Sequence, residues 1–226
     1  MFEKHKLGYF IENEEYLIFF GDINSSFDNF NNYFSQFNFI KMKQTHSQIC
    51  KEVTSTNDSN FTADAIYTKY PKLALCCITA DCLPLLIFLP HSKSVFSIHA
   101  GWRGIQNKII IRSLENFDTQ DAQVFIGPHI GFSSFEVGND VRDLILDGIE
   151  NKKVFFKPKS ENKSLLDLNK VAHHQLVNLG INEKNIHNLN KDTFKDASFH
   201  SYRRDKETAG RQISFIVLKD GGSRRN

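Results

Sequence analysis

One stretch of the chain, running from Leu73 to Gly104, constrains the fold more than any other. It reads LALCCITADCLPLLIFLPHSKSVFSIHAGWRG. Its first apolar run, residues 73–79, is suited to a buried strand, and its second, residues 94–98, alternates as a strand does. Cys82 follows the first run and His99 the second, and a Gly-Trp-Arg-Gly turn with a helical pattern comes next. We therefore predict two neighbouring strands whose ends bring a thiol and an imidazole together.

The length and the charge of the chain limit its possible partners. It has 226 residues, 40% of them hydrophobic, which is enough for a sizeable globular core. Lysine and arginine number 28 against 26 aspartates and glutamates, so the net charge is only +2. This balance argues against a nucleic-acid or membrane surface as partner. Any anion site must therefore be built locally.

Apolar runs and cysteines indicate the compartment. The longest apolar run, Cys82 to Pro90, is far shorter than the roughly 20 residues that span a bilayer. The first ten residues lack the apolar stretch of a signal peptide. The four cysteines form neither a CxxC pair nor a disulfide framework, which fits a reducing environment. We expect a cytoplasmic protein that is a monomer or a weak dimer.

The remaining periodic segments alternate between strand and helix patterns. The predicted strands span residues 7–11, 16–20, 39–43, 123–126 and 212–218. The predicted helices begin after Ser25 or Ser26 with four phenylalanines on one face, after Gly104, near residue 141 and after Asp167. Residues 50–62 are rich in Ser, Thr and Asn and are expected to form a loop. No linker divides the chain, so an α/β or α+β fold in one domain over residues 1–226 is favoured.

Three residues share the context of a ligand. His46, Cys82 and His99 each follow an apolar run and precede a turn. Two imidazoles and a thiolate suit zinc or copper, and three protein ligands leave a position open for water or substrate. Spacing alone leaves two alternatives open, because such residues are often satisfied within a core, and Cys82 can also act as a nucleophile with His99 as its base.

Seven motifs carry a resemblance to a known family. They are QTH around His46, ADAIYT, TADCLPLLI, HAGWRG, IGPHIG, FEVG, and SYRRD with the later AGR. In this order, from about Lys43 to Leu218, the sequence resembles the YfiH-like laccase-domain family, whose members are also called polyphenol oxidases or purine nucleoside phosphorylase-like proteins. The first 40 residues match poorly. The sequence also departs from the family at Ser133-Ser134 and Asp192-Thr193, where cysteines are often found.

The resemblance implies a fold, a metal and an activity. The implied fold is a single α/β domain with two mixed β-sheets packed face to face and helices outside. The implied metal is zinc, held by His46, Cys82 and His99, which would then be both the metal ligands and the catalytic residues. The implied activity is phosphorolysis of adenosine, inosine, guanosine and methylthioadenosine, with adenosine deamination in some members.

Phosphorolysis requires a phosphate site, for which the candidates are Arg203, Arg204, Arg103 and the backbone amides from Gly101 to Gly104. Consecutive residues of an extended loop point in opposite directions. We therefore expect Arg203 to contact phosphate while Arg204 pairs with a carboxylate such as Asp205 or Glu207. For Arg103 the competing expectation is a structural bridge to a carboxylate. Asp81 is expected to orient a metal ligand or to cap its own turn.

Other functions remain as alternatives. The chain has nine scattered histidines and no His-x-His pair, which argues against a full multicopper oxidase but leaves a single-copper polyphenol oxidase open. A metal-free cysteine hydrolase acting on a cell-wall amide or peptide is the second enzymatic alternative. A metal-buffering or partner-binding protein is the third, although it leaves the paired arginines unexplained.

Overall fold

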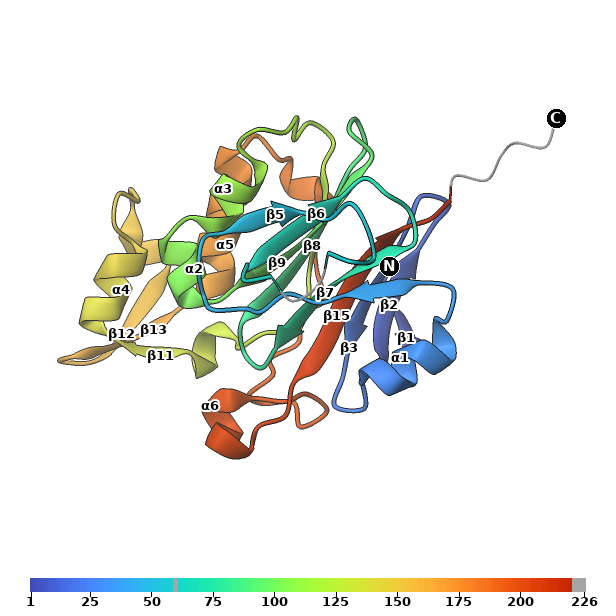
Figure 1. Cartoon of the computed structure of the whole chain (residues 1–226). Helices are drawn as coiled ribbons and strands as arrows, with labels where there is room; N and C mark the ends of the chain where they lie inside the picture. The colour runs from blue at the N-terminus through green and yellow to red at the C-terminus, as the bar shows by residue number, and fades with distance from the viewer. Residues whose placement is uncertain (59–60, 221–226) are drawn as a thin grey trace.

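Two six-stranded sheets form the centre of the protein, as the computed structural model shows for residues 1–58 and 61–220 (Figure 1). The first sheet has the order β1 (Glu3–His5), β2 (Gly8–Glu12), β3 (Tyr16–Gly21), β15 (Gln212–Leu218), β7 (Leu73–Thr79) and β4 (Asn38–Ile40). The second has the order β14 (Ile186–Asn188), β10 (Gln123–Ile126), β8 (Leu83–Leu89), β9 (Ser94–Ala100), β6 (Ala65–Thr68) and β5 (Cys50–Glu52). Both sheets are mixed, because β4 runs parallel to β7 and β5 parallel to β6 among otherwise largely antiparallel pairs.

The two sheets pack face to face through a shared apolar layer. Ile18 and Ile216 of the first sheet lie in one buried cluster with Leu86 and Val95 of the second. All four side chains are fully buried. This arrangement follows from the strand sequences, whose apolar residues occupy both faces and therefore need cover on both sides. The prediction of two mixed sheets packed face to face is confirmed.

Helices cover the outer faces. Helix α1 (Phe27–Tyr33) lies on the first sheet, where Phe30 and Phe34 pack against Phe215 with ring centroids 5.2 and 5.3 Å apart. As predicted, Ser26 caps this helix by accepting a hydrogen bond from the Asn29 amide. The second sheet is covered by α2 (Trp102–Gln106), α3 (Ile109–Leu114) and α5 (Leu168–Asn178).

Smaller elements complete the chain beside the second sheet. A three-stranded sheet, β11 (Glu136–Gly138), β13 (Lys163–Leu166) and β12 (Phe156–Ser160), packs with α4 (Asn139–Ile145). The short helix α6 (Tyr202–Asp205) precedes β15, and 3₁₀ turns span Phe132–Ser134, Lys152–Val154, Glu183–Asn185 and Lys206–Thr208. In the described part of the chain, no helix has both the length and the apolar character needed to cross a bilayer.

The main correction concerns the central strands. We predicted that strands 73–79 and 94–98 would be neighbours, but β7 and β9 belong to different sheets. The run Cys82 to Pro90, considered above only for its length, contains β8, which is the partner of β9. The chain therefore crosses from one sheet to the other at the turn that carries Cys82. Which sheet a strand joins depends on long-range pairing, which the strand's own sequence does not encode.

Four boundary predictions also need correction. The helix expected after Gly104 begins at Trp102, and it is interrupted at Lys108, whose φ of 61° separates α2 from α3. The strand expected over residues 39–43 is confined to β4, with Lys43 in an isolated bridge to Thr62. The expected loop 50–62 opens with the short strand β5, and the helix near residue 141 ends at Ile145.

Candidate metal centre and active site

The three predicted ligands meet at one place. His46 comes from the loop between β4 and β5, Cys82 from the turn between β7 and β8, and His99 from β9. Their donor atoms all lie within 4.8 Å of one another, and Sγ of Cys82 is 3.7 Å from Nε2 of His46. We call these three residues the triad. In residues 1–58 and 61–220 no other group of three or more His, Cys, Asp or Glu is placed to hold a metal.

Asp64 holds the triad together. Its fully buried carboxylate accepts a hydrogen bond from Nδ1 of His99 at 2.8 Å and another from the His46 amide at 2.9 Å. It also accepts bonds from the amide and the hydroxyl of Ser47 at 2.6 and 2.7 Å. Burial alone would raise the pKa of Asp64, but the bonds from His99 and Ser47 hold it far below its usual range. The anion thus fixes the ring of one ligand and the loop that carries another.

Asp64 is a site residue that was not predicted from the sequence. It belongs to the motif ADAIYT, one of the motifs that resemble the family. The available signal was a carboxylate between two alanines at the start of an apolar strand, a position where an unpaired charge is too costly to bury. That pattern indicates a buried partner without saying which residue it is.

Cys82 and His99 shift each other's protonation. Burial favours the neutral thiol, yet the imidazoles of His99 and His46 outweigh it and lower the pKa of Cys82 to about 6. Burial alone would lower the pKa of His99, but the Cys82 thiolate and the Asp64 carboxylate raise it to about 9. At neutral pH the metal-free pair is therefore a thiolate beside an imidazolium, and the thiolate is the form that binds metals.

The surroundings of the triad suit a metal ion. A thiolate and two imidazoles are a donor set found at zinc sites with an open position. Gly101 lies so close that a Cβ there would be 2.7 Å from Cδ2 of His46 and 3.0 Å from Sγ of Cys82. This close approach of His46 and Cys82 to the backbone leaves no room for a side chain at position 101. The contact of the Gly101 amide with phosphate stays a prediction.

The triad opens into a cavity of about 730 Å³. One part of its wall is apolar and includes Trp102, Phe135, Val141 and Leu168. Another part is cationic, with the lining residues Arg103, Arg203, Lys206 and Arg211. Asp81 is the one carboxylate among the lining residues. The cavity therefore combines a candidate metal site, an apolar surface and an excess of positive charge, although the whole chain is almost neutral.

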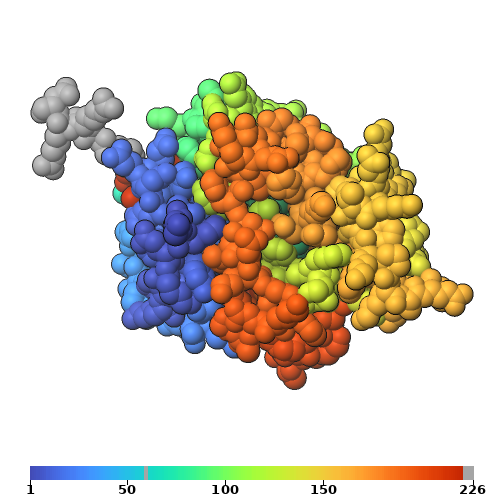
Figure 2. All heavy atoms as spheres, turned by 180° about the vertical axis from the view of Figure 1, so that it is seen from behind, coloured from blue at the N-terminus to red at the C-terminus, as the bar shows by residue number. Residues whose placement is uncertain are grey.

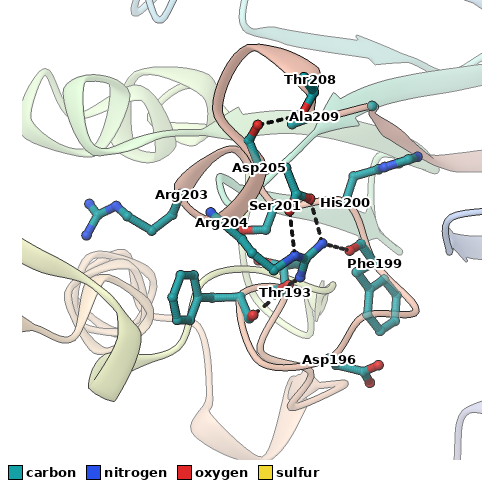
Figure 3. A network of polar contacts seen from close by, with 12 residues as sticks. Thr193, Asp196, Phe199, His200, Ser201, Arg203, Arg204, Asp205, Thr208 and Ala209 are labelled. Carbon is teal, nitrogen blue, oxygen red and sulfur yellow. Dashed lines mark hydrogen bonds and ion pairs between the residues drawn. The ribbon is translucent and has the colours of Figure 1, made fainter.

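The segment 191–211, here called the C-terminal arm, forms part of this wall. In Figure 2 an orange segment of the C-terminal third crosses the back of the molecule between the blue N-terminal part and the yellow region around β12. Figure 3 shows that the side chains of Arg203 and Arg204, neighbours on this arm, extend in different directions. The two arginine side chains therefore contact different parts of the protein.

Arg203 faces the cavity and Arg204 is bound within the arm. Arg203 lines the cavity, with its guanidinium 5.5 Å from the Phe135 ring centroid and one donor bonded to the carbonyl of Glu136. Arg204 makes a paired contact with the Asp205 carboxylate, 2.8 Å for each bond. Its remaining bonds go to the arm carbonyls of Thr193, Phe194 and Phe199 (Figure 3). Arg204 is not among the residues that line the cavity.

Two secondary expectations are wrong. Arg103 was expected to bridge to a carboxylate, but it is exposed, lies 4.3 Å from the Trp102 ring centroid and forms no ion pair with any described residue. Asp81 was expected to orient a metal ligand or to cap its own turn. Its carboxylate instead bonds to the arm, at the Thr193 hydroxyl and the Arg203 amide. The partners of Asp81 lie more than 100 positions away in the sequence, with separations of 112 and 122, so no local pattern could predict them.

Comparisons with known proteins identify the family to which the chain is similar. The sequence model of the family described as "Multi-copper polyphenol oxidoreductase laccase" matches residues 26–219. A purine nucleoside phosphorylase of Haemophilus influenzae is 36% identical over 182 residues, covering 78% of this chain and 73% of that protein. The purine nucleoside phosphorylase YfiH of Escherichia coli is 32% identical over 182 residues, covering 79% and 73%.

A solved structure shows the same fold. The crystal structure of YlmD from Geobacillus stearothermophilus superimposes with a TM-score of 0.86 at 20% identity, covering 97% of this chain and 99% of that one. The description of the family names several coppers, but the described residues form a single group of three possible ligands. A blue-copper centre together with an oxygen-reducing cluster needs more histidine ligands than this group provides. With the family model matching most of its length, the chain belongs to the multi-copper polyphenol oxidoreductase laccase family, the YfiH-like laccase-domain family that its motifs resemble.

Proposed function

We propose that this protein is a zinc-dependent purine nucleoside phosphorylase that acts on adenosine, inosine, guanosine and methylthioadenosine, and that it also deaminates adenosine. The observation that carries the proposal is that the triad and Arg203 line the same cavity. The names of the relatives supply the class of reaction. His46, Cys82 and His99 would hold the zinc, which would supply a Lewis acid next to the substrate.

The side chains of this protein would bind and orient the two reactants. Arg203 would hold phosphate through charge-assisted hydrogen bonds. A guanidinium has five N–H groups, and the bond to the Glu136 carbonyl uses one of them, so the others can donate to phosphate. The apolar wall around Trp102 and Phe135 would accept the faces of the purine. Asp64 would keep the His99 ring in one tautomer, with Nδ1 as the protonated nitrogen.

The reaction would proceed with a simple exchange of bonds. An oxygen of hydrogen phosphate bonds to C1′ of the ribose as the bond from C1′ to the purine nitrogen breaks. The electron pair of the broken bond leaves with the purine, and the proton of the hydrogen phosphate ends on the purine nitrogen. The products are the free purine and the sugar 1-phosphate. Because the transition state has oxocarbenium character, phosphate held by Arg203 would stabilise its positive charge.

A nucleoside panel tests this proposal. The purified protein is incubated with adenosine, inosine, guanosine and methylthioadenosine, with and without phosphate, and its metal content is measured in parallel. We expect about one zinc per chain and release of free purine together with the sugar 1-phosphate, in phosphate-containing samples only. Purine release at the same rate without phosphate, or no turnover of any nucleoside, would contradict a phosphorylase. Conversion of adenosine to inosine reports the deaminase activity separately.

One observation favours a second candidate, a metal-free cysteine hydrolase. Cys82, His99 and Asp64 stand in the order nucleophile, base and orienting carboxylate, and the pKa of Cys82 is lowered to about 6 by the imidazoles against the effect of burial. The substrate would then be an amide or peptide such as those of the cell wall. Protein purified without metal and irreversibly inactivated by a thiol reagent at Cys82 would favour this candidate. Loss of activity on chelation and its return with zinc would favour the phosphorylase.

A further inference from the structure

Asp81 connects the turn that carries Cys82 to the C-terminal arm. Its carboxylate Oδ1 accepts a hydrogen bond from the Thr193 hydroxyl at 2.6 Å, and Oδ2 accepts one from the Arg203 amide, also at 2.6 Å. Its own carbonyl accepts a bond from the Ile130 amide at 3.0 Å. Three segments that are distant in the sequence are thereby joined at the residue that directly precedes Cys82.

The backbone at Asp81 is unusual and suits this role. Its φ is +84°, a region that few residues other than glycine adopt, although Asp and Asn tolerate it better than most. This conformation occurs in the turn where the chain crosses between the two sheets. The same turn therefore carries Cys82 of the triad and the carboxylate that binds the arm.

The hydrogen bond to Asp81 fixes the backbone position of Arg203. The Arg203 amide is held by Oδ2 of Asp81, while the far end of the side chain is held by the Glu136 carbonyl at 3.0 Å and the face of Phe135. With both ends held, the guanidinium stays in the cavity wall, where Arg203 is a lining residue. Arg204, whose donors are used within the arm and by Asp205, keeps the arm itself in one shape.

We propose that Asp81 is a positioning residue that sets the distance between the triad and the guanidinium of Arg203. This inference rests on the proposed function, in which the triad and Arg203 act on one nucleoside and one phosphate. Two reactants held by separate groups react efficiently only when those groups keep a fixed spacing, and a misplacement of about 1 Å can cost roughly 100-fold in rate. Asp81 directly precedes Cys82 in the chain, and its carboxylate accepts a hydrogen bond from the backbone amide of Arg203.

Two substitutions distinguish the effect of the Asp81 carboxylate from the effect of the backbone conformation of its turn. Asp81→Gly removes the carboxylate while retaining the positive φ without strain. Asp81→Asn keeps an oxygen that can accept from the Arg203 amide, and its NH₂ group can donate to the Thr193 hydroxyl. The matched control is Ser134→Ala, which removes another 2.6 Å side-chain bond to the arm, from Ser134 to Asp192, that does not involve Arg203.

Phosphate binding by calorimetry, the Michaelis constants for phosphate and nucleoside, and zinc content are measured for each variant. We expect Asp81→Gly to weaken phosphate binding by at least about tenfold, with zinc content and the nucleoside constant close to wild type. Asp81→Asn should restore most of the phosphate affinity, and Ser134→Ala should leave it unchanged. A merely structural role would lower stability without this selective effect on phosphate.

Specific outcomes would overturn the inference. If Asp81→Gly binds phosphate as wild type does, Asp81 does not position Arg203. If Asp81→Gly loses zinc together with phosphate affinity, Asp81 is a support for the Cys82 turn instead. Phosphate-dependent cleavage by the wild type with either result would leave the proposed function intact. If the wild-type protein neither binds phosphate nor requires it for turnover, the inference and the proposed function fail together.

Discussion

The carboxylate of Asp64 accepts a hydrogen bond from Nδ1 of His99 at 2.8 Å, and both side chains are removed from water, with exposures of 0% and 4%. The same carboxylate also holds the backbone of His46, which adopts a φ of 60°. Asp64 therefore orients two of the three triad residues. Since a ligand's partner fixes both its tautomer and its direction, the metal affinity of the triad should depend on a residue that does not itself belong to it.

Replacing Asp64 tests this dependence. Asp64→Asn should weaken zinc binding by about 10- to 100-fold, because an amide cannot accept all the bonds that orient His99, His46 and Ser47. Competition with a calibrated chelator measures the affinity. Asp58→Asn is the matched control, because the described bonds of the half-buried Asp58 carboxylate go to Thr54 and Ser55 of its own loop, away from the triad. Equal zinc affinities for the two variants would contradict the role of Asp64.

The ligand assignment is tested at Cys82. Cys82→Ala should remove most of the zinc and the nucleoside activity together, because the two remaining imidazoles hold zinc poorly. Metal analysis and product analysis of the same sample give both values. Cys76→Ala serves as the control, because Cys76 is buried in the core beside α1. This variant protein should keep the zinc content of the wild type. Full zinc occupancy in Cys82→Ala would show that the ligand set is wrong.

The protonation of the metal-free triad predicts a pH dependence. Because the pKa of Cys82 is lowered to about 6 by the imidazoles against burial, the thiolate persists at pH 7 and is lost only as the pH falls through about 6. The rate of alkylation by iodoacetamide, followed by mass spectrometry after chelation of metal, should fall through that same pH. Cys50 is an internal control, because burial raises its pKa to about 11 and it should stay unmodified at neutral pH. A midpoint near the usual thiol value of about 8.5 would refute the prediction.

The paired arginines should differ in what their loss affects. Arg203→Ala should raise the Michaelis constant for phosphate roughly thirtyfold, the equivalent of about 2 kcal/mol for one charge-assisted contact, with little change in stability. Arg204→Ala should instead lower the free energy of unfolding by about 2 kcal/mol, because it breaks the bonds to Asp205 and to the carbonyls of the arm. Steady-state kinetics and urea unfolding separate these effects. If both variants keep the wild-type constant for phosphate, neither arginine binds it.

Local sequence patterns were sufficient for many elements of the fold. The phenylalanine spacing and Ser26 predicted α1, and Asp167 predicted the start of α5, because helix periodicity and capping involve residues within a few positions of one another. The apolar runs predicted β7, β9 and β15 for the same reason. The motifs around His46, Cys82 and His99 predicted, through the family resemblance, that these three residues come together.

The tertiary structure determines which strands and side chains come into contact. The sequence alone determined the residue types and their local conformations, including a Cys82 next to a turn and two adjacent arginines. Only the packed chain shows that β7 and β9 lie in different sheets, that Asp64 supports His99, and that Asp81 bonds to Arg203. Such contacts join residues tens of positions apart. Their energy comes from burial and from hydrogen bonds that exist only once both sheets are assembled, so no local window of sequence contains them.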